Sequence, residues 1–380
     1  MPLTVLQVIP NLGAGGSEQA CIDIAAALKA RGDKALVVSA GGQRVSEIIQ
    51  SGGKHYVHNV ASKNPLAILV NAIWLARFMR AHKVDIIHVR SRAPAWSGWI
   101  AGRLAKRSFV TTFHAAYKYS NPLKKFYNRV MTRSDRIIAI SNFIADHIKN
   151  SYGISANKVR VIYRGIDLNK FAPDSINENR KDSIRRSWSV SPDQRLLLLP
   201  ARLSAIKGQD LLIQAVALLP PEFYNVTAVI LGDDQGRTEY RRKLQGVIHS
   251  LKLANRIKLV DHCNDMPAAY AVAELVVVPS SVPEGFGRVP VEAMAMGIPV
   301  IASNLGATQE TVIEGETGWL LPPESPKLWA AAIVKALNLT TKQKDRMKEC
   351  AVKRAHALFD RSQMIDRTLA VYDELVGKGV

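Results

Sequence analysis

Short apolar runs rich in β-branched residues alternate with longer segments of helical period along most of this 380-residue chain. Such an alternation is typical of parallel sheets whose strands are connected by helices. The first half contains five predicted strands: residues 4–9, 35–39, 84–89, 109–113 and 136–140. The second half contains five more: residues 196–200, 227–231, 257–260, 275–279 and 299–302. The pattern therefore predicts an α/β chain with two doubly wound sheets, one in each half.

The segments between these strands predict helices. They cover residues 17–31, 65–82, 93–106, 122–133, 209–219, 238–251, 266–272, 289–296 and 326–337. Residues 171–190 are polar and lose the apolar period, which predicts a linker between an N-terminal domain, residues 1–170, and a C-terminal domain, residues 191–360. A last helical stretch at about 361–380 follows the final strand, so we expect it to pack back on the N-terminal domain.

The net charge of the chain is concentrated in its first half. Residues 1–170 hold 25 Lys and Arg against 8 Asp and Glu, a net charge of +17, whereas the remaining residues carry a net charge of +2. The densest stretch runs from Arg103 to Arg136, where nine cations face a single acid, Asp135. A nucleic acid, an acidic membrane surface or a phosphorylated lipid would each fit this charge. A solvated basic face without a partner is the alternative.

Several classes of protein are excluded by what the sequence lacks. The N-terminus has no basic region followed by an apolar core, and no run of about 18 uncharged apolar residues occurs. Cys21, Cys263 and Cys350 lie too far apart to suggest a metal site or a disulfide framework. We therefore expect a cytoplasmic protein without a secretion signal or a membrane span, whose membrane association would be peripheral.

The turn after the first predicted strand carries glycines that let backbone amides approach a diphosphate. Gly13, Gly15 and Gly16 precede a predicted helix, but Glu18 stands where a GxGxxG fingerprint needs its third glycine. The second predicted strand also lacks the acid that binds a ribose at its end, and the chain contains no GxxxxGK[ST] motif. The sequence thus disfavours a nicotinamide dehydrogenase and a P-loop nucleotidase.

Two turns in the second half combine cations, acids and glycines. Arg202 and Lys207 follow the strand at 196–200, and a guanidinium with an ammonium suits a diphosphate that is held and then leaves. Glu284 lies on a glycine turn after the strand at 275–279, where it can accept hydrogen bonds from sugar hydroxyls. Glu292 follows eight residues later among apolar neighbours, and a carboxylate there usually has a specific partner such as a ribose diol.

The segments PEGFGRVPVEAMAMGIPVIAS and ARLSAIKGQDLLIQA, with the early glycine turn and the ending GETGWLLPP, resemble the GT4 family of retaining glycosyltransferases. The resemblance spans nearly the whole chain. It implies the GT-B fold, in which two Rossmann-like domains face a central cleft. Further stretches are similar to bacterial glycosyltransferases of lipopolysaccharide-core and surface-polysaccharide synthesis: HVRSRAPAWSGWIAGR, TTFHAAYKY, LGDDQGR and DHCNDMPAAYAVAE.

The resemblance also implies a role for each motif residue. Arg202 and Lys207 would bind the donor diphosphate and stabilise it as it leaves, and Glu284 would hold hydroxyls of the transferred sugar. The implied catalytic residues are Glu284, Lys207, Arg202 and His114. The implied donor-binding residues are Gly15, Gly16, Arg202, Lys207, His262, Met266, Glu284, Gly285, Phe286, Gly287, Arg288, Val289 and Glu292. His262 and Glu274 stand where the family usually has glycine and aspartate, which leaves the identity of the nucleotide base open.

The acceptor is expected on the N-terminal domain, where an acidic lipid-linked saccharide or a lipopolysaccharide core at the cytoplasmic membrane face would match the charge. The predicted acceptor or lipid contacts are Arg90, Arg92, Lys118, Tyr119, Lys124 and Lys125. The expected donor is GDP-mannose, followed by UDP-sugars. The resemblance implies front-face displacement with retention, and we expect no metal, no cofactor and no nucleic acid. A GT-B-type sugar-nucleotide epimerase or phosphorylase and a basic nucleic-acid-binding protein remain alternatives.

Overall fold

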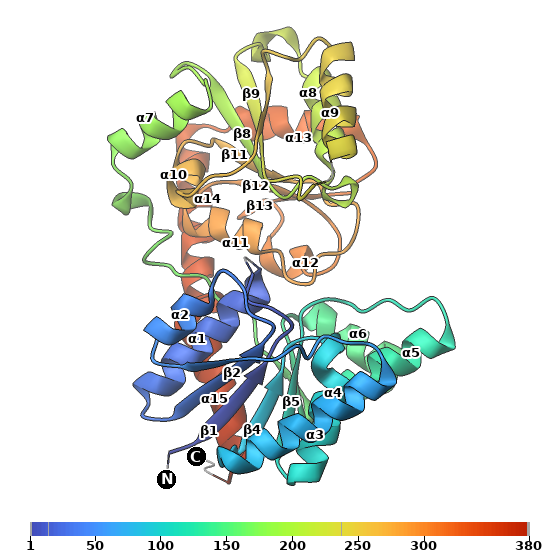
Figure 1. Ribbon diagram of the computed structural model, residues 1–380. Coiled ribbons are helices and arrows are strands. Elements are labelled where there is room, and N and C mark those ends of the chain that lie inside the picture. Colours follow the sequence, from blue (N-terminus) through green and yellow to red (C-terminus); the bar gives the residue numbers. More distant parts are fainter. Residues whose placement is uncertain (1, 14, 237, 378–380) are drawn as a thin grey trace. The chain divides into compact units, whose positions relative to one another are not determined.

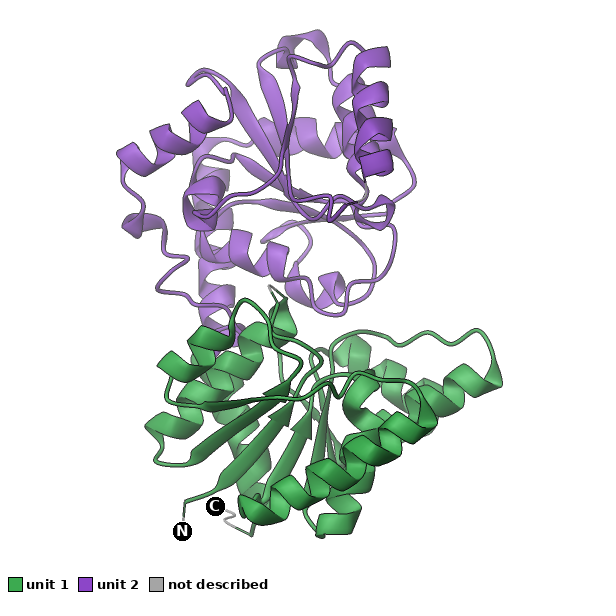
Figure 2. Ribbon diagram, viewed as in Figure 1, with its two compact units in different colours: residues 1–163, 362–380 green, residues 164–361 purple. Residues whose placement is uncertain are grey.

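The computed structural model describes residues 2–13, 15–236 and 238–377. The chain forms two compact units (Figures 1 and 2). Unit 1 contains Met1–Tyr163 and Ser362–Val380, and unit 2 contains Arg164–Arg361. Among the described residues, no helix is both long and apolar enough to cross a membrane.

Unit 1 is built on a seven-stranded sheet in which every neighbouring pair is parallel. Its strands are β1 (Thr4–Val8), β2 (Lys34–Ser39), β3 (Lys54–Val57), β4 (Ile86–Val89), β5 (Ser108–Phe113), β6 (Arg136–Ala139) and β7 (Val159–Val161). Its helices are α1 (Gly16–Ala30), α2 (Val45–Gln50), α3 (Pro65–Ala81), α4 (Arg92–Ala105), α5 (Pro122–Arg129), α6 (Asn142–Tyr152) and nearly all of α15 (Arg361–Leu375). The sheet order is β3-β2-β1-β4-β5-β6-β7.

Unit 2 repeats the scheme with six parallel strands. They are β8 (Arg195–Pro200), β9 (Val226–Leu231), β10 (Ile257–Val260), β11 (Leu275–Val278), β12 (Val300–Ser303) and β13 (Gly318–Leu321), in the order β10-β9-β8-β11-β12-β13. The helices are α7 (Glu178–Ser187), α8 (Gln209–Ala217), α9 (Thr238–Ser250), α10 (Met266–Ala271), α11 (Arg288–Ala295), α12 (Thr308–Thr311), α13 (Pro326–Leu337) and α14 (Thr341–Leu358).

Short 3-10 helices complete the description of both units. They are η1 (Val130–Thr132), η2 (Ala156–Lys158), η3 (Pro173–Ser175), η4 (Ala205–Lys207) and η5 (Pro221–Phe223).

The central strands are apolar because helices cover both faces of each sheet. All five residues of β1 and the four leucines of β8 are buried. Burial on both faces explains why the sequence of β8 is a continuous apolar run rather than an alternation, and β1 differs only in its buried Thr4 and Gln7. Helix α15 adds Met364, Leu369 and Tyr372 to the same core cluster as β1 and α1.

The strand order of each sheet reverses at one point, between β1 and β4 in unit 1 and between β8 and β11 in unit 2. Ligands of doubly wound proteins bind at such switch points, beside the carboxyl ends of the strands. The turns that follow these four strands are therefore the places to look for a site.

The predicted α/β class with two doubly wound sheets is confirmed, and all ten predicted strands are present. Sequence reasoning missed β3, β7 and β13, which have only three or four residues each, and it missed α2, α6, α7, α12 and α14. Strands β3 and β7 lie at the sheet edges and are partly exposed, so they lack the apolar run that marks the others.

The segment predicted as a linker, residues 171–190, is folded. It contains α7, and Phe171, Ile184 and Trp188 are buried in unit 2. Helix α7 is mostly polar and has only one buried side chain, Ile184, so its apolar period is too weak to predict a helix.

The chain enters unit 2 between Tyr163 and Arg164 and returns to unit 1 after Arg361. Residues 378–380 of the predicted last helix lie outside the described residues.

Candidate functional site at the strand ends

The helices that follow the four switch-point strands begin without a side-chain cap. Helices α1, α8 and α11 start after Gly15, Gly208 and Gly287, and α4 starts after Ser91, and none of the four has a capping hydrogen bond from that side chain. Seven other helices, α3, α5, α6, α7, α10, α13 and α14, are capped by an Asn, Ser, Asp or Thr side chain. Because the first amides of a helix have no internal partner, an uncapped N-terminus is suited to bind an anion.

In unit 2, an ion pair connects the turns after β8 and β11. The ammonium of Lys207 donates to Glu284 Oε1 at 2.5 Å, and the hydroxyl of Ser280 donates to the same oxygen at 2.7 Å. Both charged side chains are about one-fifth exposed, so each retains access to a ligand. The arrangement places a cation and a carboxylate between the N-termini of α8 and α11.

Two glycines allow these turns to approach each other. Gly208 has φ +72°, and a Cβ added to it would lie 1.9 Å from the carbonyl oxygen of Pro279. Gly306 has φ +65°, and a Cβ there would lie 2.7 Å from the carbonyl oxygen of Glu284. That carbonyl accepts a hydrogen bond from Ala307 N at 3.0 Å, which fixes the Glu284 turn against the turn after β12. The position of Glu284 is thus set by backbone contacts on two sides.

Glu292 is buried on α11 and its carboxylate has two partners. Arg288 donates to Oε1 at 2.8 Å and the phenol of Tyr270 donates to Oε2 at 2.9 Å. Burial, followed by the charge of Glu292, raises the pKa of Tyr270 well above its ordinary value, so the phenol remains a donor. These partners hold the carboxylate in one orientation, as the binding of a ribose diol would require.

The other cation of the turn, Arg202, is exposed and forms no ion pair with a described residue. Its backbone is fixed, because the carbonyl of Arg202 accepts a hydrogen bond from the buried Gln209 side chain at 3.0 Å. Gln209 also accepts from the phenol of Tyr240 at 3.2 Å, and burial raises the pKa of Tyr240 to about 12. Arg202 therefore projects from a rigid turn with its guanidinium available.

His262 and Met266, two of the donor-binding residues that the resemblance implies, lie in the segment that leads from β10 into α10. His262 is exposed and its Nε2 lies 2.7 Å from Asn264 Oδ1, and Met266 is half-buried at the first position of α10. Asp265 caps α10 and receives two hydrogen bonds from Arg180 of α7, at 2.6 and 2.8 Å. The Arg180 guanidinium holds the pKa of Asp265 below its usual value. Helix α7 thus positions this segment.

Glu274 lies away from this site. It precedes the first residue of β11, at the opposite edge of the sheet from the strand carboxyl ends. Its carboxylate accepts from Arg195 and Lys344 at 2.7 Å each. Burial would raise the pKa of Glu274, but these two cations outweigh it and lower the pKa. Glu274 connects β8 and α14, so its departure from the family residue carries no information about the base.

In unit 1, Gly15 and Gly16 lie at the start of α1, as expected. The Glu18 carboxylate lies beside them: a Cβ added to Gly15 would be 2.3 Å from Glu18 Oε2, which also accepts from Ser17 Oγ at 2.6 Å. An anion that binds this N-terminus must therefore displace the Glu18 side chain. His114 directly follows β5 and is half-buried.

The prediction that Arg90 contacts the acceptor or a lipid is wrong, because Arg90 is only 3% exposed. Its amide donates to the carbonyl of Val8 and continues the β1–β4 ladder, so the side chain points into the core. There its Nε and Nη2 donate to Gln7 Oε1 at 2.9 and 2.6 Å. The neighbouring His88 contacts the hydroxyls of Tyr372 and Thr112 at 2.6 and 2.7 Å. Arg90 is part of a buried polar network.

The other predicted acceptor contacts lie at or near the surface. Lys118, Tyr119, Lys124 and Lys125 are exposed, and the Lys125 ammonium lies 5.0 Å from the centre of the Tyr119 ring. Arg92 is half-buried, with its guanidinium 4.3 Å from the Tyr117 ring and one nitrogen 3.0 Å from Asn128 Oδ1.

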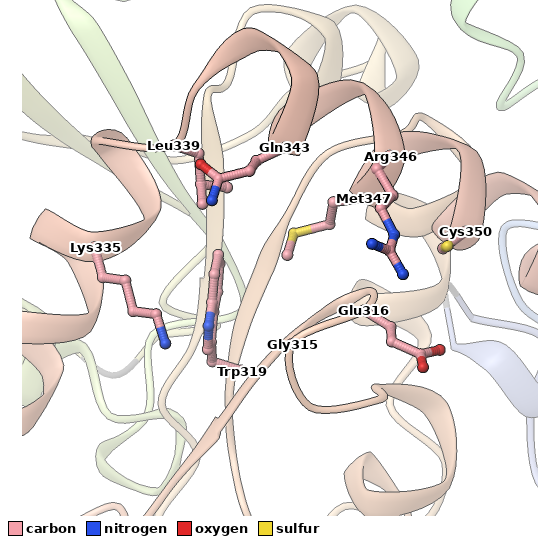
Figure 3. Close-up of a pocket in the computed structure, with 9 residues that line it drawn as sticks. All are labelled: Gly315, Glu316, Trp319, Lys335, Leu339, Gln343, Arg346, Met347 and Cys350. Carbon is pink, nitrogen blue, oxygen red and sulfur yellow. The ribbon is translucent and has the colours of Figure 1, made fainter.

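A cavity of about 340 Å³ lies elsewhere in unit 2, among β13, α13 and α14 (Figure 3). Trp319, Lys335, Gln343 and Arg346 are among the residues that line it. None of the catalytic, donor-binding or acceptor-binding residues expected from the sequence lines it, although Gly315, Glu316 and Trp319 belong to the GETGWLLPP ending. The Lys207–Glu284 pair is in different turns. The candidate site is therefore the group of strand ends and not this cavity.

Sequence reasoning did not identify Ser280, Tyr270, Arg180 or Tyr117. Ser280 precedes Glu284 by four residues in the same turn, just before the PEGFGR motif, and this proximity was the available signal. Tyr270 and Arg180 reach Glu292 and Asp265 from other elements, which no local pattern reveals.

Two doubly wound units, with a cation, a carboxylate and uncapped helix N-termini at the switch point of the second, are the features expected of a glycosyltransferase that binds a nucleotide sugar. The family model for glycosyl transferases group 1 matches residues 180–354, and the model for glycosyltransferase family 4 matches residues 14–170. A glycosyltransferase from Rickettsia africae ESF-5, known from its crystal structure, is 31% identical, covers 99% of both chains and has a TM-score of 0.92. The chain belongs to the GT4 glycosyltransferases and has the GT-B fold.

Two further relatives show how far the similarity extends. The Anabaena protein Alr3699/HepE, solved in complex with UDP-glucose, is 28% identical over 98% of this chain and 100% of its own, with a TM-score of 0.85. The spore coat protein SA of Bacillus subtilis (strain 168) is 24% identical over 376 residues, which is 95% of each chain. The similarity thus includes both units.

Proposed function

We propose that this glycosyltransferase transfers a hexose with retention from a nucleoside-diphosphate sugar to an anionic, lipid-linked saccharide acceptor of lipopolysaccharide-core type at the cytoplasmic membrane face. The observation that carries the donor side is the Lys207–Glu284 pair between the uncapped starts of α8 and α11. A diphosphate needs donors and positive charge, and a hexose needs a fixed acceptor for its hydroxyls. The turns after β8 and β11 supply both.

In the proposed reaction, the acceptor hydroxyl attacks the anomeric carbon on the face from which the diphosphate departs. The bond between the anomeric carbon and the phosphate oxygen breaks, the bond to the acceptor oxygen forms, and the leaving diphosphate takes the hydroxyl proton. Negative charge grows on the diphosphate, so Lys207, Arg202 and the first amides of α11 stabilise the transition state. Glu284 fixes the sugar, and Glu292 binds the ribose.

The donor we propose is a UDP-hexose, because the relative HepE was solved with UDP-glucose and is similar over both units. GDP-mannose, the donor first expected, forms the competing arm of the test. The positive charge of residues 1–170, +17, supports an anionic acceptor on unit 1. As acceptor contacts we propose Arg92, the first residue of α4, and Tyr117, whose ring centre lies 4.3 Å from the Arg92 guanidinium.

The test is a panel of sugar nucleotides assayed by thermal shift and by slow hydrolysis. A ligand at one hundred times its Kd stabilises the fold by about 2.7 kcal/mol, so the true donor should stand out. We expect UDP-hexoses to raise the melting temperature of the wild type but not of Lys207→Ala, with Lys181→Ala, at a partly exposed lysine of α7, as the matched control. A shift confined to GDP-mannose would replace the proposed base and sugar.

The same panel distinguishes the other classes. An epimerised sugar nucleotide, or cleavage that requires inorganic phosphate, would indicate an epimerase or a phosphorylase instead of a transferase. Salt-sensitive binding of DNA with no response to any sugar nucleotide would indicate a nucleic-acid-binding role.

A further inference from the structure

Helix α3 of unit 1 has an apolar face that no described element covers. Leu66, Leu69, Val70 and Ile73 have exposures between 41% and 75%. Their spacing of three, four and seven residues places them on one side of the helix. Apolar residues scattered singly over a surface are ordinary, whereas four on one helical stripe form a patch that marks an interaction.

The opposite face of α3 is firmly packed, so the exposed stripe does not arise from a loosely attached helix. Asn71, Leu75 and Met79 are buried. Trp74 stacks on His58 at 3.9 Å and on Phe78 at 5.2 Å between ring centres. The helix also lies along α4, whose Ser97 hydroxyl donates to the carbonyl of Ile68 at 3.1 Å.

Helix α5 extends the apolar surface beyond α4. Leu123 and Phe126 are 81% and 56% exposed. The Phe126 ring lies 5.3 Å from Trp96 of α4, and Trp96 Nε1 donates to the carbonyl of Tyr127 at 3.1 Å. Helices α3, α4 and α5 are therefore successive neighbours on unit 1 (Figure 1).

The charge around this surface has one sign. Residues 48–134 contain 15 Lys and Arg and one acid, Asp85, which lies outside all three helices. The helices themselves hold seven cations and no acid. Arg77 and Arg80 continue the stripe of α3, and Lys124 and Lys125 lie between Leu123 and Phe126. Exposed leucine, isoleucine and phenylalanine beside lysine and arginine are typical of segments that lie in the interface of an anionic membrane.

We propose that the α3–α5 surface, formed by Leu66, Leu69, Val70, Ile73, Leu123 and Phe126 with the cations beside them, inserts into the headgroup region of an anionic lipid bilayer. The apolar side chains enter the acyl boundary while the lysines and arginines contact lipid phosphates. The occupant is a bilayer because apolar exposure and uniform positive charge occur together, whereas a second copy of this surface would bring like charges together. This inference deepens the proposed function. It rests on that function only for the biological role of membrane binding, and not for the binding itself.

The experiment is sedimentation of the full chain with vesicles of phosphatidylglycerol and phosphatidylcholine in equal parts, and with vesicles of phosphatidylcholine alone. We expect the wild type to sediment with the first and not with the second. Leu66→Ser with Val70→Ser should lower the partition coefficient at least ~10-fold through lost apolar burial. Lys124→Glu with Lys125→Glu should lower it at least ~30-fold.

Matched controls come from exposed residues of unit 2. Leu218→Ser with Leu328→Ser changes two half-exposed leucines, and Lys342→Glu with Lys353→Glu reverses two exposed charges of α14. Both control pairs should bind vesicles as the wild type does. High salt should release the Leu66→Ser/Val70→Ser protein fully and the wild type only in part, because salt screens charge but leaves apolar insertion.

The proposal is overturned if the wild type does not bind the anionic vesicles or if the α3 and α5 variants bind them equally well. It is also overturned if the wild type is a dimer in lipid-free sedimentation and Leu66→Ser/Val70→Ser makes it a monomer, because α3 then meets a second copy. Donor hydrolysis on the same preparations separates the two hypotheses. Vesicle binding without hydrolysis would contradict only the proposed function, and hydrolysis without vesicle binding would contradict only this inference.

Discussion

Lys207 and Glu284 are 77 residues apart in the chain, yet the ammonium of one lies 2.5 Å from the carboxylate of the other. The contact joins the turns that follow β8 and β11, the two strands between which the sheet order of unit 2 reverses. Ser280 adds a second donor to the same carboxylate oxygen. Lys207 and Ser280 thus fix the orientation of the Glu284 carboxylate, as a preorganised site would require.

Loss of either charge should abolish most of the transfer. We expect Lys207→Ala and Glu284→Gln each to reduce kcat/KM at least ~100-fold, because a preorganised charge at the reacting centre is worth a few kcal/mol. Lys181→Ala removes a comparable, partly exposed ammonium from the Lys181–Glu178 pair and should leave turnover unchanged. Steady-state assays with circular dichroism of each variant provide the measurement. Wild-type turnover of Lys207→Ala would refute the site.

The carboxylate of Glu292 should matter more for donor binding than for chemistry. Glu292→Gln keeps the shape of the side chain and can still accept from Tyr270, but it loses the charge facing Arg288. We expect KM for the donor to rise about 10-fold with kcat within about 3-fold, as removal of a ground-state hydrogen bond predicts. Glu178→Gln on exposed α7 serves as the control. A fall in kcat alone would assign Glu292 to the reacting centre instead.

Chelation should leave transfer largely unchanged. In the proposed site Arg202, Lys207 and helix amides would meet the charge of the diphosphate, and the sequence has no Asp-x-Asp triplet to hold an ion. The assay is run with excess EDTA and then with added Mn²⁺ or Mg²⁺. Activity that disappears with EDTA and returns with either ion would contradict the prediction.

The close approach at Gly208 should make this position intolerant of any side chain. Gly208→Ala would place a Cβ 1.9 Å from the Pro279 carbonyl, whereas Gly315, at a similar φ of +74°, has nothing within 4 Å. Gly315→Ala should therefore cost only the left-handed strain, about 1 kcal/mol or about 2–4 °C of melting temperature. Gly208→Ala should cost about 1–3 kcal/mol more and also weaken donor binding. Equal melting temperatures of the two variants would show that the β8 turn can shift without penalty.

The buried His88 should make stability fall at mildly acidic pH. Burial, together with the charge of Arg90, holds the pKa of His88 well below 6.5. The unfolded chain protonates this imidazole near pH 6.5 and the folded chain does not, so below that pH the unfolded state binds one more proton. The free energy of unfolding should then fall by about 1.4 kcal/mol per pH unit from this group.

Replacement of the imidazole tests this origin. His88→Gln should flatten the dependence of melting temperature on pH between about 7.5 and 5.5, and His249→Gln on exposed α9 should not. The slope is the relevant quantity, because His88→Gln also loses contacts to Tyr372 and Thr112 and is less stable at every pH. An unchanged slope would mean that His88 is protonated in the folded chain.

The strands, and the two turns that carry Lys207 and Glu284, could be predicted from the sequence because both follow from the pattern of buried parallel strands. Buried parallel strands such as β8 are continuous apolar runs, and residues after adjacent strands meet at one edge, which brings Lys207 near Glu284. The approach of Gly306 to Glu284 could not be predicted, because it depends on backbone turns of separate segments.

Two features of unit 1 show why side-chain exposure is harder to predict. A cation just after a strand is expected at the surface, yet Arg90 turns inward because Gln7 accepts two of its hydrogen bonds from another strand. The sequence of α3 has apolar residues on nearly all sides, so its period predicts the helix but not which face remains uncovered.

The return of α15 to unit 1 has a consequence for the order in which the chain can fold during synthesis. Met364, Leu369 and Tyr372 complete the core formed by β1 and α1, although more than 300 residues separate them along the chain. The ribosome makes the whole of unit 2 before it makes these residues, so the first unit translated is the last to finish its core. Until then, the side of the sheet that α15 covers remains open to solvent and to chaperones.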